Sequence, residues 1–80
     1  MNVTVRFRTV EDVKRFCGII GKYEFQADFV SGRYVVDAKS IMGIYSLNLN
    51  KDVTLIIHED DCDVVRKFLN EISDLLVKEN

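Results

Sequence analysis

The sequence predicts an α+β domain of two layers, in which helices cover one face of an open, four-stranded sheet. Four short stretches alternate polar and apolar residues, as strands with one buried face do. Longer stretches between and after them repeat apolar residues at helical spacing. Because each strand has a single apolar face, the helices should all pack on that face. No linker, repeat or low-complexity segment interrupts the order β-α-β-β-α-β-α, so we expect residues 1–80 to form a single domain.

A strand and a helix open the chain. The first predicted strand alternates polar side chains with Val3, Val5 and Phe7. Thr9 is then a preferred N-cap type, and Asp12 stands in the acidic position of a capping box. The helix repeats its apolar residues at helical spacing, at Val10, Val13, Phe16, Cys17 and Ile20. Gly21 can end this helix.

A β-hairpin and a short helix occupy the middle of the chain. The apolar face of the second strand consists of Tyr23, Phe25, Ala27 and Phe29. Ser31-Gly32 predicts a tight turn into a third strand, Arg33 to Val36. Ser40 then stands as an N-cap before a helix that Gly43 weakens by about 1 kcal/mol relative to Ala. Ile44 and Leu47 can face the core, but one helical turn cannot also bury Ile41, Met42 and Tyr45.

The last quarter of the chain predicts a strand and a helix. Val53 to His58 form the fourth strand, and Asp60 or Asp61 caps the helix that follows. The apolar stripe of this helix is Val65, Phe68, Leu69, Ile72, Leu75 and Leu76, and we expect the chain to fray at Lys78-Glu79-Asn80. The expected core includes Val5, Phe25, Phe29, Leu55, Ile57, Phe68 and Ile72. The expected open face of the sheet carries Thr4, Glu24, Gln26, Thr54, Ile56 and His58.

Composition excludes several classes of function. With 11 basic and 13 acidic residues the net charge is −2, which argues against nucleic acid or a membrane surface as a direct partner. Cys17 and Cys62 lack metal-ligand spacing and fall in helical apolar patterns, so we interpret both as small core residues in a reducing, cytoplasmic protein. Asp60, Asp61 and Asp63 lack the spacing of a calcium loop and indicate a helix start. We expect no metal and no cofactor.

Residues 39–47, Lys-Ser-Ile-Met-Gly-Ile-Tyr-Ser-Leu, resemble the regulatory segment of HPr, the phosphocarrier of the bacterial sugar phosphotransferase system. The resemblance extends to Val36-Asp37-Ala38 before this segment and to the strand Val53 to Ile57 after it. It implies an antiparallel sheet of order 1-4-2-3 with three helices on one face. It also implies that Ser40 is a phosphorylation site and that Lys39, Ile41, Met42 and Tyr45 contact protein partners.

One segment departs from the HPr pattern. Members of the family carry a phosphate-accepting histidine, an arginine and a proline after the first strand, whereas residues 7–15 here contain neither His nor Pro. The only histidine, His58, ends the fourth strand, and we interpret it as a surface residue at the other end of the sheet. The resemblance therefore implies a non-enzymatic, regulatory protein like the histidine-less paralogue of carbon catabolite repression. An HPr kinase and a transcriptional regulator would be its partners.

Two other functions stay open on the sequence. The chain could be a divergent interaction domain that is not phosphorylated, or a small-ligand sensor of ACT type, since the same element order also fits ferredoxin-like folds. The sequence leaves the oligomeric state undetermined.

Overall fold

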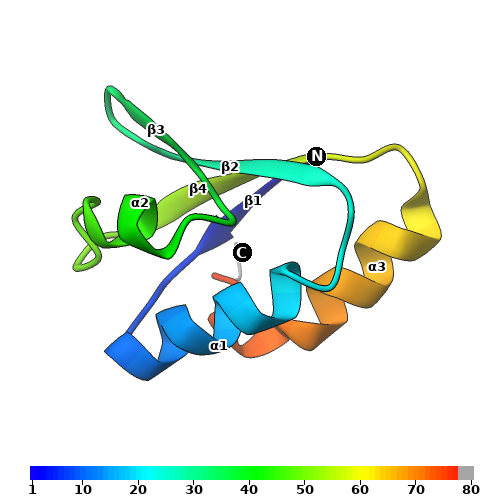
Figure 1. The fold of residues 1–80 in the computed structure, drawn as a ribbon, viewed down its shortest axis with the longest axis horizontal. Helices are drawn as coiled ribbons and strands as arrows, with labels where there is room; N and C mark the ends of the chain where they lie inside the picture. Colours follow the sequence, from blue (N-terminus) through cyan, green and yellow to red (C-terminus); the bar gives the residue numbers. More distant parts are fainter. Residues whose placement is uncertain (78–80) are drawn as a thin grey trace.

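The computed structural model describes residues 1–77, and the frayed end expected at residues 78–80 lies outside the described residues. The strands are β1 (Asn2–Val5), β2 (Gln26–Ser31), β3 (Tyr34–Asp37) and β4 (Val53–His58). The helices are α1 (Val10–Ile20), α2 (Ile41–Tyr45) and α3 (Cys62–Glu71), and a 3₁₀ turn, η1, follows at Ser73–Leu75. In Figure 1, α1 and α3 run side by side under the sheet, and α2 lies beneath the β2–β3 hairpin.

The strands form one antiparallel sheet in the order β1-β4-β2-β3. Val5 pairs with Val53, and Gln26 pairs with His58, so β4 and β2 occupy the centre. This is the predicted 1-4-2-3 order of the HPr fold, and it sets aside the ferredoxin-like and ACT-like alternatives. All three helices lie on one side of the sheet, which confirms the predicted two layers (Figure 1).

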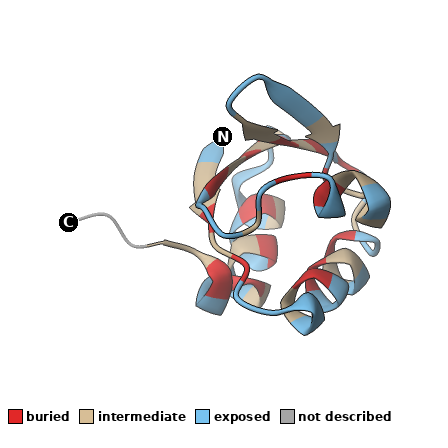
Figure 2. Cartoon of the chain, turned by 90° about the vertical axis from the view of Figure 1, so that its left-hand side faces the viewer, coloured by how far each residue is buried: buried red, intermediate tan, exposed pale blue. Residues whose placement is uncertain are grey.

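The core between the layers is built around aromatic side chains. Phe68 of α3 packs edge-on against Phe16, Tyr23 and Phe25, with ring centroids 6.1, 5.3 and 5.2 Å away. All seven residues expected in the core are buried. Figure 2 shows the buried residues facing the space between the sheet and the helices. The residues expected on the open face that lie in strands are exposed or half-buried, whereas Glu24 lies in the loop before β2.

The predicted ends of several elements are wrong. β1 ends at Val5 and does not reach Phe7, and β3 ends at Asp37, one residue later than predicted. α3 ends at Glu71, so Leu75 and Leu76 of the predicted helical stripe lie in η1 and just after it. The second strand begins at Gln26, not Tyr23, because its neighbour β4 ends at His58, the partner of Gln26. Tyr23 and Phe25 instead form a loop that packs on Phe68. The third strand begins one residue later than predicted, at Tyr34, since Ser31 stays in β2 and the turn residues are Gly32 and Arg33. Gly32 has φ +61°, a conformation that glycine adopts without a steric penalty.

Two residues assigned to the core from helical spacing are exposed. Val10, the first residue of α1, is 57% exposed, whereas the buried residues of this helix begin at Val13, one turn further on. Cys62 begins α3 and is also exposed, whereas Cys17 is half-buried. Within residues 1–77, none of the helices has the length and apolar character needed to cross a membrane.

Candidate functional site

Ser40 caps α2 as the sequence predicts. Its backbone is extended, and its Oγ accepts a hydrogen bond of 3.1 Å from the N–H of Gly43. Because this bond uses an Oγ lone pair, the hydroxyl proton of Ser40 is not engaged by it. The N–H of Ser40 donates to the carbonyl of Asp37, which fixes the cap directly beyond the end of β3. Ser40 itself is half-buried.

Gly43 lets α2 pack closely on β3. A Cβ at this position would lie 3.3 Å from Ser40 Oγ and 3.3 Å from Val36 Cβ. Those separations are tighter than ordinary van der Waals contact, so the helix depends on the missing side chain for its position. Ile44 and Leu47 then reach the core, with exposed fractions of 0% and 7%. A helix of only five residues is thus held by its cap and by tertiary packing.

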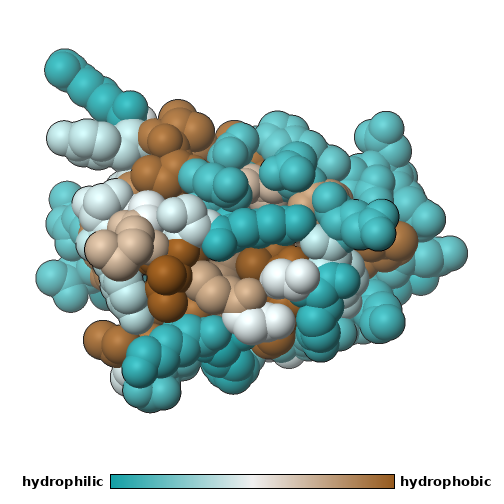
Figure 3. Space-filling view, viewed as in Figure 1, coloured by the Kyte–Doolittle hydropathy of each residue, from teal (hydrophilic) through white to brown (hydrophobic). Residues whose placement is uncertain are grey.

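The remaining apolar residues of α2 form an exposed surface with the start of α1. Met42 is 75% exposed and Tyr45 is 37% exposed, while Ile41 packs partly against the core. Tyr45 and Val10 line a shallow pocket of 190 Å³ together with Phe7, Arg8, Thr9, Leu49 and Asn50. Figure 3 shows apolar residues gathered between α2 and α1 on this face. We call Ile41, Met42, Tyr45 and Val10 the α2 patch. The position of Val10 beside Tyr45 was not predicted, because its helical spacing indicated the core.

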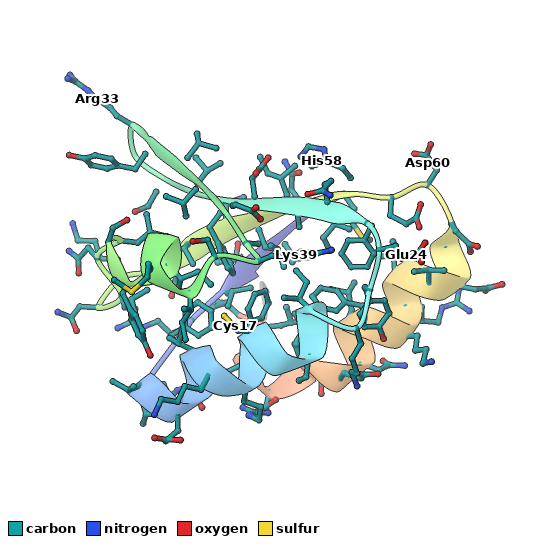
Figure 4. All side chains as sticks on the ribbon, viewed as in Figure 1. Cys17, Glu24, Arg33, Lys39, His58 and Asp60 are labelled. Carbon is teal, nitrogen blue, oxygen red and sulfur yellow. The ribbon has the colours of Figure 1, made fainter. Side chains whose placement is uncertain are left out.

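Lys39 lies differently from the rest of the predicted partner-binding set. Its Nζ donates a 2.6 Å hydrogen bond to the carbonyl of Tyr23, in the loop between α1 and β2. Figure 4 shows the Lys39 side chain running toward that loop and away from α2. Its backbone N–H is bound by Asp37 Oδ1 at 2.8 Å. Lys39 therefore ties the segment before α2 to the body of the domain.

In the connection from β1 to α1, side chains of the protein itself accept hydrogen bonds from the backbone N–H groups at the start of the helix. Thr9 Oγ1 accepts from the N–H of Asp12 at 3.1 Å, and Asp12 Oδ2 accepts from the N–H of Arg8 at 3.0 Å. The hydrogen bond from Arg8 and, more weakly, that from Arg15 lower the pKa of Asp12, because both stabilise its ionised carboxylate. A negative group here opposes the binding of a second anion at these amides.

His58 lies far from that connection. Val5, the last residue of β1, pairs with Val53, the first residue of β4, whereas His58 is the last residue of β4. The imidazole is exposed, and its Nε2 lies 3.0 Å from Asp28 Oδ2 on the open face of the sheet. In Figure 4, His58 lies on the side of the sheet away from the helices. Its partner Asp28 was not anticipated, since the two residues meet only through the β2–β4 register.

The acidic residues before α3 serve as a helix start. Asp61 is the N-cap, and its Oδ1 accepts from the N–H groups of Asp63 and Val64 at 2.9 and 3.4 Å. Among residues 1–77, no group of three or more His, Cys, Asp or Glu side chains is arranged to hold a metal ion.

Comparison with solved structures relates this fold to phosphocarrier proteins. The chain is 25% identical to HPr-C-His from Thermoanaerobacter tengcongensis, with a TM-score of 0.72 over 92% of this chain and 88% of that one. It is 19% identical to the phosphocarrier protein HPr from Bacillus anthracis, with a TM-score of 0.67 over 96% and 94% of the two chains. Crh, the catabolite repression protein of Bacillus subtilis, is 21% identical, with a TM-score of 0.63 over 92% and 88%, and forms a domain-swapped dimer. No protein-family model matches the sequence, and no curated protein matches it.

Proposed function

Since this chain has the HPr fold and is a relative of the HPr family, we propose that it is a regulatory protein that acts by binding other proteins. Its binding surface is the α2 patch, and phosphorylation of Ser40 controls what that surface binds. It does not carry phosphate on a histidine.

The observation that carries this proposal is the position of Ser40 beside exposed apolar side chains. Met42 lies two residues after the cap and, at 75%, is the most exposed of the large apolar side chains in residues 1–77. Adaptable side chains such as Met, together with aromatic rings, are enriched where proteins meet. A modification at Ser40 would therefore act at the edge of a surface that is suited to docking.

The chemistry of the β1–α1 connection argues against a phosphocarrier. Phosphoryl transfer through this position needs a histidine nitrogen and anion-binding groups at the start of the helix. Here Thr9 and Asp12 occupy the N-terminus of α1, and Glu11 adds a second carboxylate in its first turn. His58 has Asp28 at 3.0 Å and lies at the opposite end of the β1–β4 pair.

A phosphate on Ser40 would change the charge of the surface while preserving the fold. It adds about −1.5 to −2 charges at neutral pH and three acceptor oxygens. Ser40 Oγ already accepts from the N–H of Gly43, so an oxygen at this position keeps a donor partner after modification. The phosphorylated surface should then repel acidic partners and attract a partner that presents arginine.

The direct test uses purified HPr kinase with ATP and intact-mass spectrometry. We expect the wild type to gain one phosphate, and Ser40→Ala to gain none. Ser46→Ala is the matched control, because Ser46 closes the same helix through a 2.6 Å bond to the Gly43 carbonyl. Phosphate on Ser46, or no phosphate on the wild type, would refute the regulatory role of Ser40.

A second test addresses the phosphocarrier function. With labelled phosphoenolpyruvate and enzyme I, the protein should stay unlabelled, whereas an HPr with its histidine takes up label. Acid-labile label on His58 would overturn the geometric argument.

The third test addresses the docking surface. Binding partners should be lost by Met42→Glu and altered by Ser40→Asp, which keeps an N-cap oxygen. Asn70→Glu on α3 adds the same charge as Met42→Glu at an exposed position elsewhere. A partner retained equally by wild type, Ser40→Asp and Met42→Glu would place the binding surface outside α2.

A further inference from the structure

The two edges of the sheet differ in how they are covered. The β1 edge meets the end of the described chain, where Val5 bridges to Leu76 and the N–H of Val77 donates to the Thr4 carbonyl at 2.9 Å. In residues 1–77, β3 pairs only with β2, so its outer edge is open. Tyr34 and Val35 are 71% and 65% exposed, and Figure 2 colours most of β3 as exposed. Open edge strands are templates for pairing with another strand.

The hydrogen-bond pattern of the hairpin fixes which backbone groups face outward. Ser31 and Tyr34 close a two-residue turn, and the N–H of Ala38 donates to the Ala27 carbonyl. In an antiparallel pair, bonded and non-bonded residues alternate, so the bonded positions on β3 are even-numbered. The backbone N–H and C=O groups of Val35 therefore point to the open edge, as does the N–H of Asp37.

The sequence of β3 and its turn complements itself when two copies run antiparallel. With Val35 opposite Val35 of a second copy, Arg33 faces Asp37 and Tyr34 faces Val36 across the junction. Val35 and Asp37 share the open face of the sheet with Val30 and Asp28. Two opposite-charge pairs thus flank an apolar centre on that face, and cross-strand pairs of these kinds are stabilising.

The charges of Arg33 and Asp37 lack ion-pair partners among residues 1–77. Asp37 instead lies directly opposite Asp28 in the β2–β3 register, an unfavourable pairing of like charges. Arg33 extends away from the hairpin tip into solvent (Figure 4). A cation placed beside Asp37 would offset its repulsion with Asp28.

We propose that β3 is a homodimerisation edge, where two copies of this chain pair antiparallel about a two-fold axis at Val35. The two sheets join into one of eight strands, with the helices of both copies on the same side. Val35 exchanges backbone hydrogen bonds with Val35 of the second copy, and Arg33 pairs with Asp37 in both directions. Because each copy contributes a strand of only four residues, the interface is small and the dimer should dissociate on dilution.

The test is a charge exchange followed by sedimentation velocity at low ionic strength. Arg33→Asp places four carboxylates at the junction, and Asp37→Arg places four cations there, so each variant alone should be monomeric at concentrations where the wild type dimerises. An equimolar mixture of the two restores both opposite-charge pairs and should recover the dimer. Recovery in the mixture also excludes misfolding as the cause of dissociation.

Lys51→Asp is the matched control for Arg33→Asp. Lys51 carries the same charge and lines the same surface groove as Arg33, but it lies outside the β2–β3 hairpin, in the connection before β4. We expect this variant to dimerise like the wild type, and the exchange of the Val35 amide with deuterium to slow as wild-type concentration rises. The proposal fails if the wild type stays monomeric at millimolar concentration, or if the mixture stays monomeric. It also fails if Arg33→Asp dimerises normally, as a domain-swapped dimer or another contact would allow.

Discussion

The α1–α3 side of the molecule is held by side-chain hydrogen bonds and ion pairs, whereas the β3–α2 side exposes large apolar side chains. On the first side, Arg15 donates to Asp74 at 3.0 Å, and Glu71 accepts from Lys22 and Tyr23 at 3.1 and 3.0 Å. On the second side, Tyr34, Val35 and Met42 are each more than 60% exposed, at 71%, 65% and 75%. On the α1–α3 side, ion pairs join different secondary-structure elements, whereas the β3–α2 side leaves apolar surface exposed to solvent.

This difference separates the part that stabilises the fold from the part that is available to partners. Phe16 of α1 and Phe68 of α3 are fully buried, whereas α2 buries only Ile44 completely. Regions with few buried contacts open more readily and are the usual place of binding and regulation. Substitutions on the two sides should therefore have different consequences for stability.

The largest effect is expected from Phe68→Ala. Phe68 contacts three aromatic rings and is fully buried, so its truncation should lower the free energy of unfolding by about 3–5 kcal/mol. Met42→Ala, on the exposed side, should change it by less than about 0.5 kcal/mol. Urea unfolding measures both. A loss below about 1 kcal/mol for Phe68→Ala would mean that the helix register is wrong.

Removal of either N-cap should cost a similar free energy of unfolding, but only the loss of the Ser40 cap should open its helix locally. Removing the cap oxygen by Thr9→Ala or Ser40→Ala should each cost about 1 kcal/mol. Hydrogen exchange should then quicken locally in α2 for Ser40→Ala, because few buried contacts hold that helix. Ser40→Asp keeps an acceptor and is the control. Equal protection of α2 in the wild type and Ser40→Ala would contradict this reading of the cap.

Two helical glycines give a finer comparison. A Cβ at Gly18 meets nothing within 4 Å, so Gly18→Ala should raise stability by about 0.5–1 kcal/mol through helix propensity. A Cβ at Gly43 lies 3.3 Å from Val36 Cβ and from Ser40 Oγ, and Gly43→Ala should lose this gain. Thermal unfolding midpoints distinguish the two. Equal stabilisation by both substitutions would show that α2 does not need its close approach to β3.

The smallest effect is the acid dependence of the closed side. Hydrogen bonds from Arg15 lower the pKa of Asp74 from its usual 3.8, and those from Lys22 and then Tyr23 lower the pKa of Glu71 from 4.5. A carboxylate whose pKa is lowered by folding stabilises the folded state. This contribution is complete at pH values above the pKa of the unfolded chain, and it is lost as the pH falls through the folded-state pKa. Asp74→Asn should therefore lose less stability than the wild type between pH 6 and pH 3, as followed by urea midpoints. A loss as large as that of the wild type would show that the Arg15–Asp74 pair does not contribute.

Features within a few residues of one another could be predicted without the structure. Ser40 and Thr9 each cap a helix through a bond to the N–H three residues later, so residue type and spacing were sufficient. The alternation of Val53, Leu55 and Ile57 likewise gave the buried face of β4 correctly. The strand order required more, since periodicity alone allowed several topologies and the resemblance to HPr selected one.

The position of the proposed binding surface depends on contacts between residues far apart in the sequence. Val10 has core spacing, yet the packing of α1 against the sheet leaves it beside Tyr45, at the edge of the 190 Å³ pocket. Lys39 follows Asp37 in sequence, but its ammonium is bound by the carbonyl of Tyr23. Neither arrangement has a local signal, because each depends on where α2 and the α1–β2 loop lie.

The sequence by itself thus determined which segments are helices and strands, where the helices begin and which of their faces are apolar. These features depend on hydrogen bonding and burial among residues that are close in the sequence. Only the packed structure decided that Asp28 meets His58, that Arg15 meets Asp74 and that the edge of β3 stays open. Pairs such as Arg15 and Asp74, 59 residues apart, are brought together by the burial of the whole core, and no local preference encodes them.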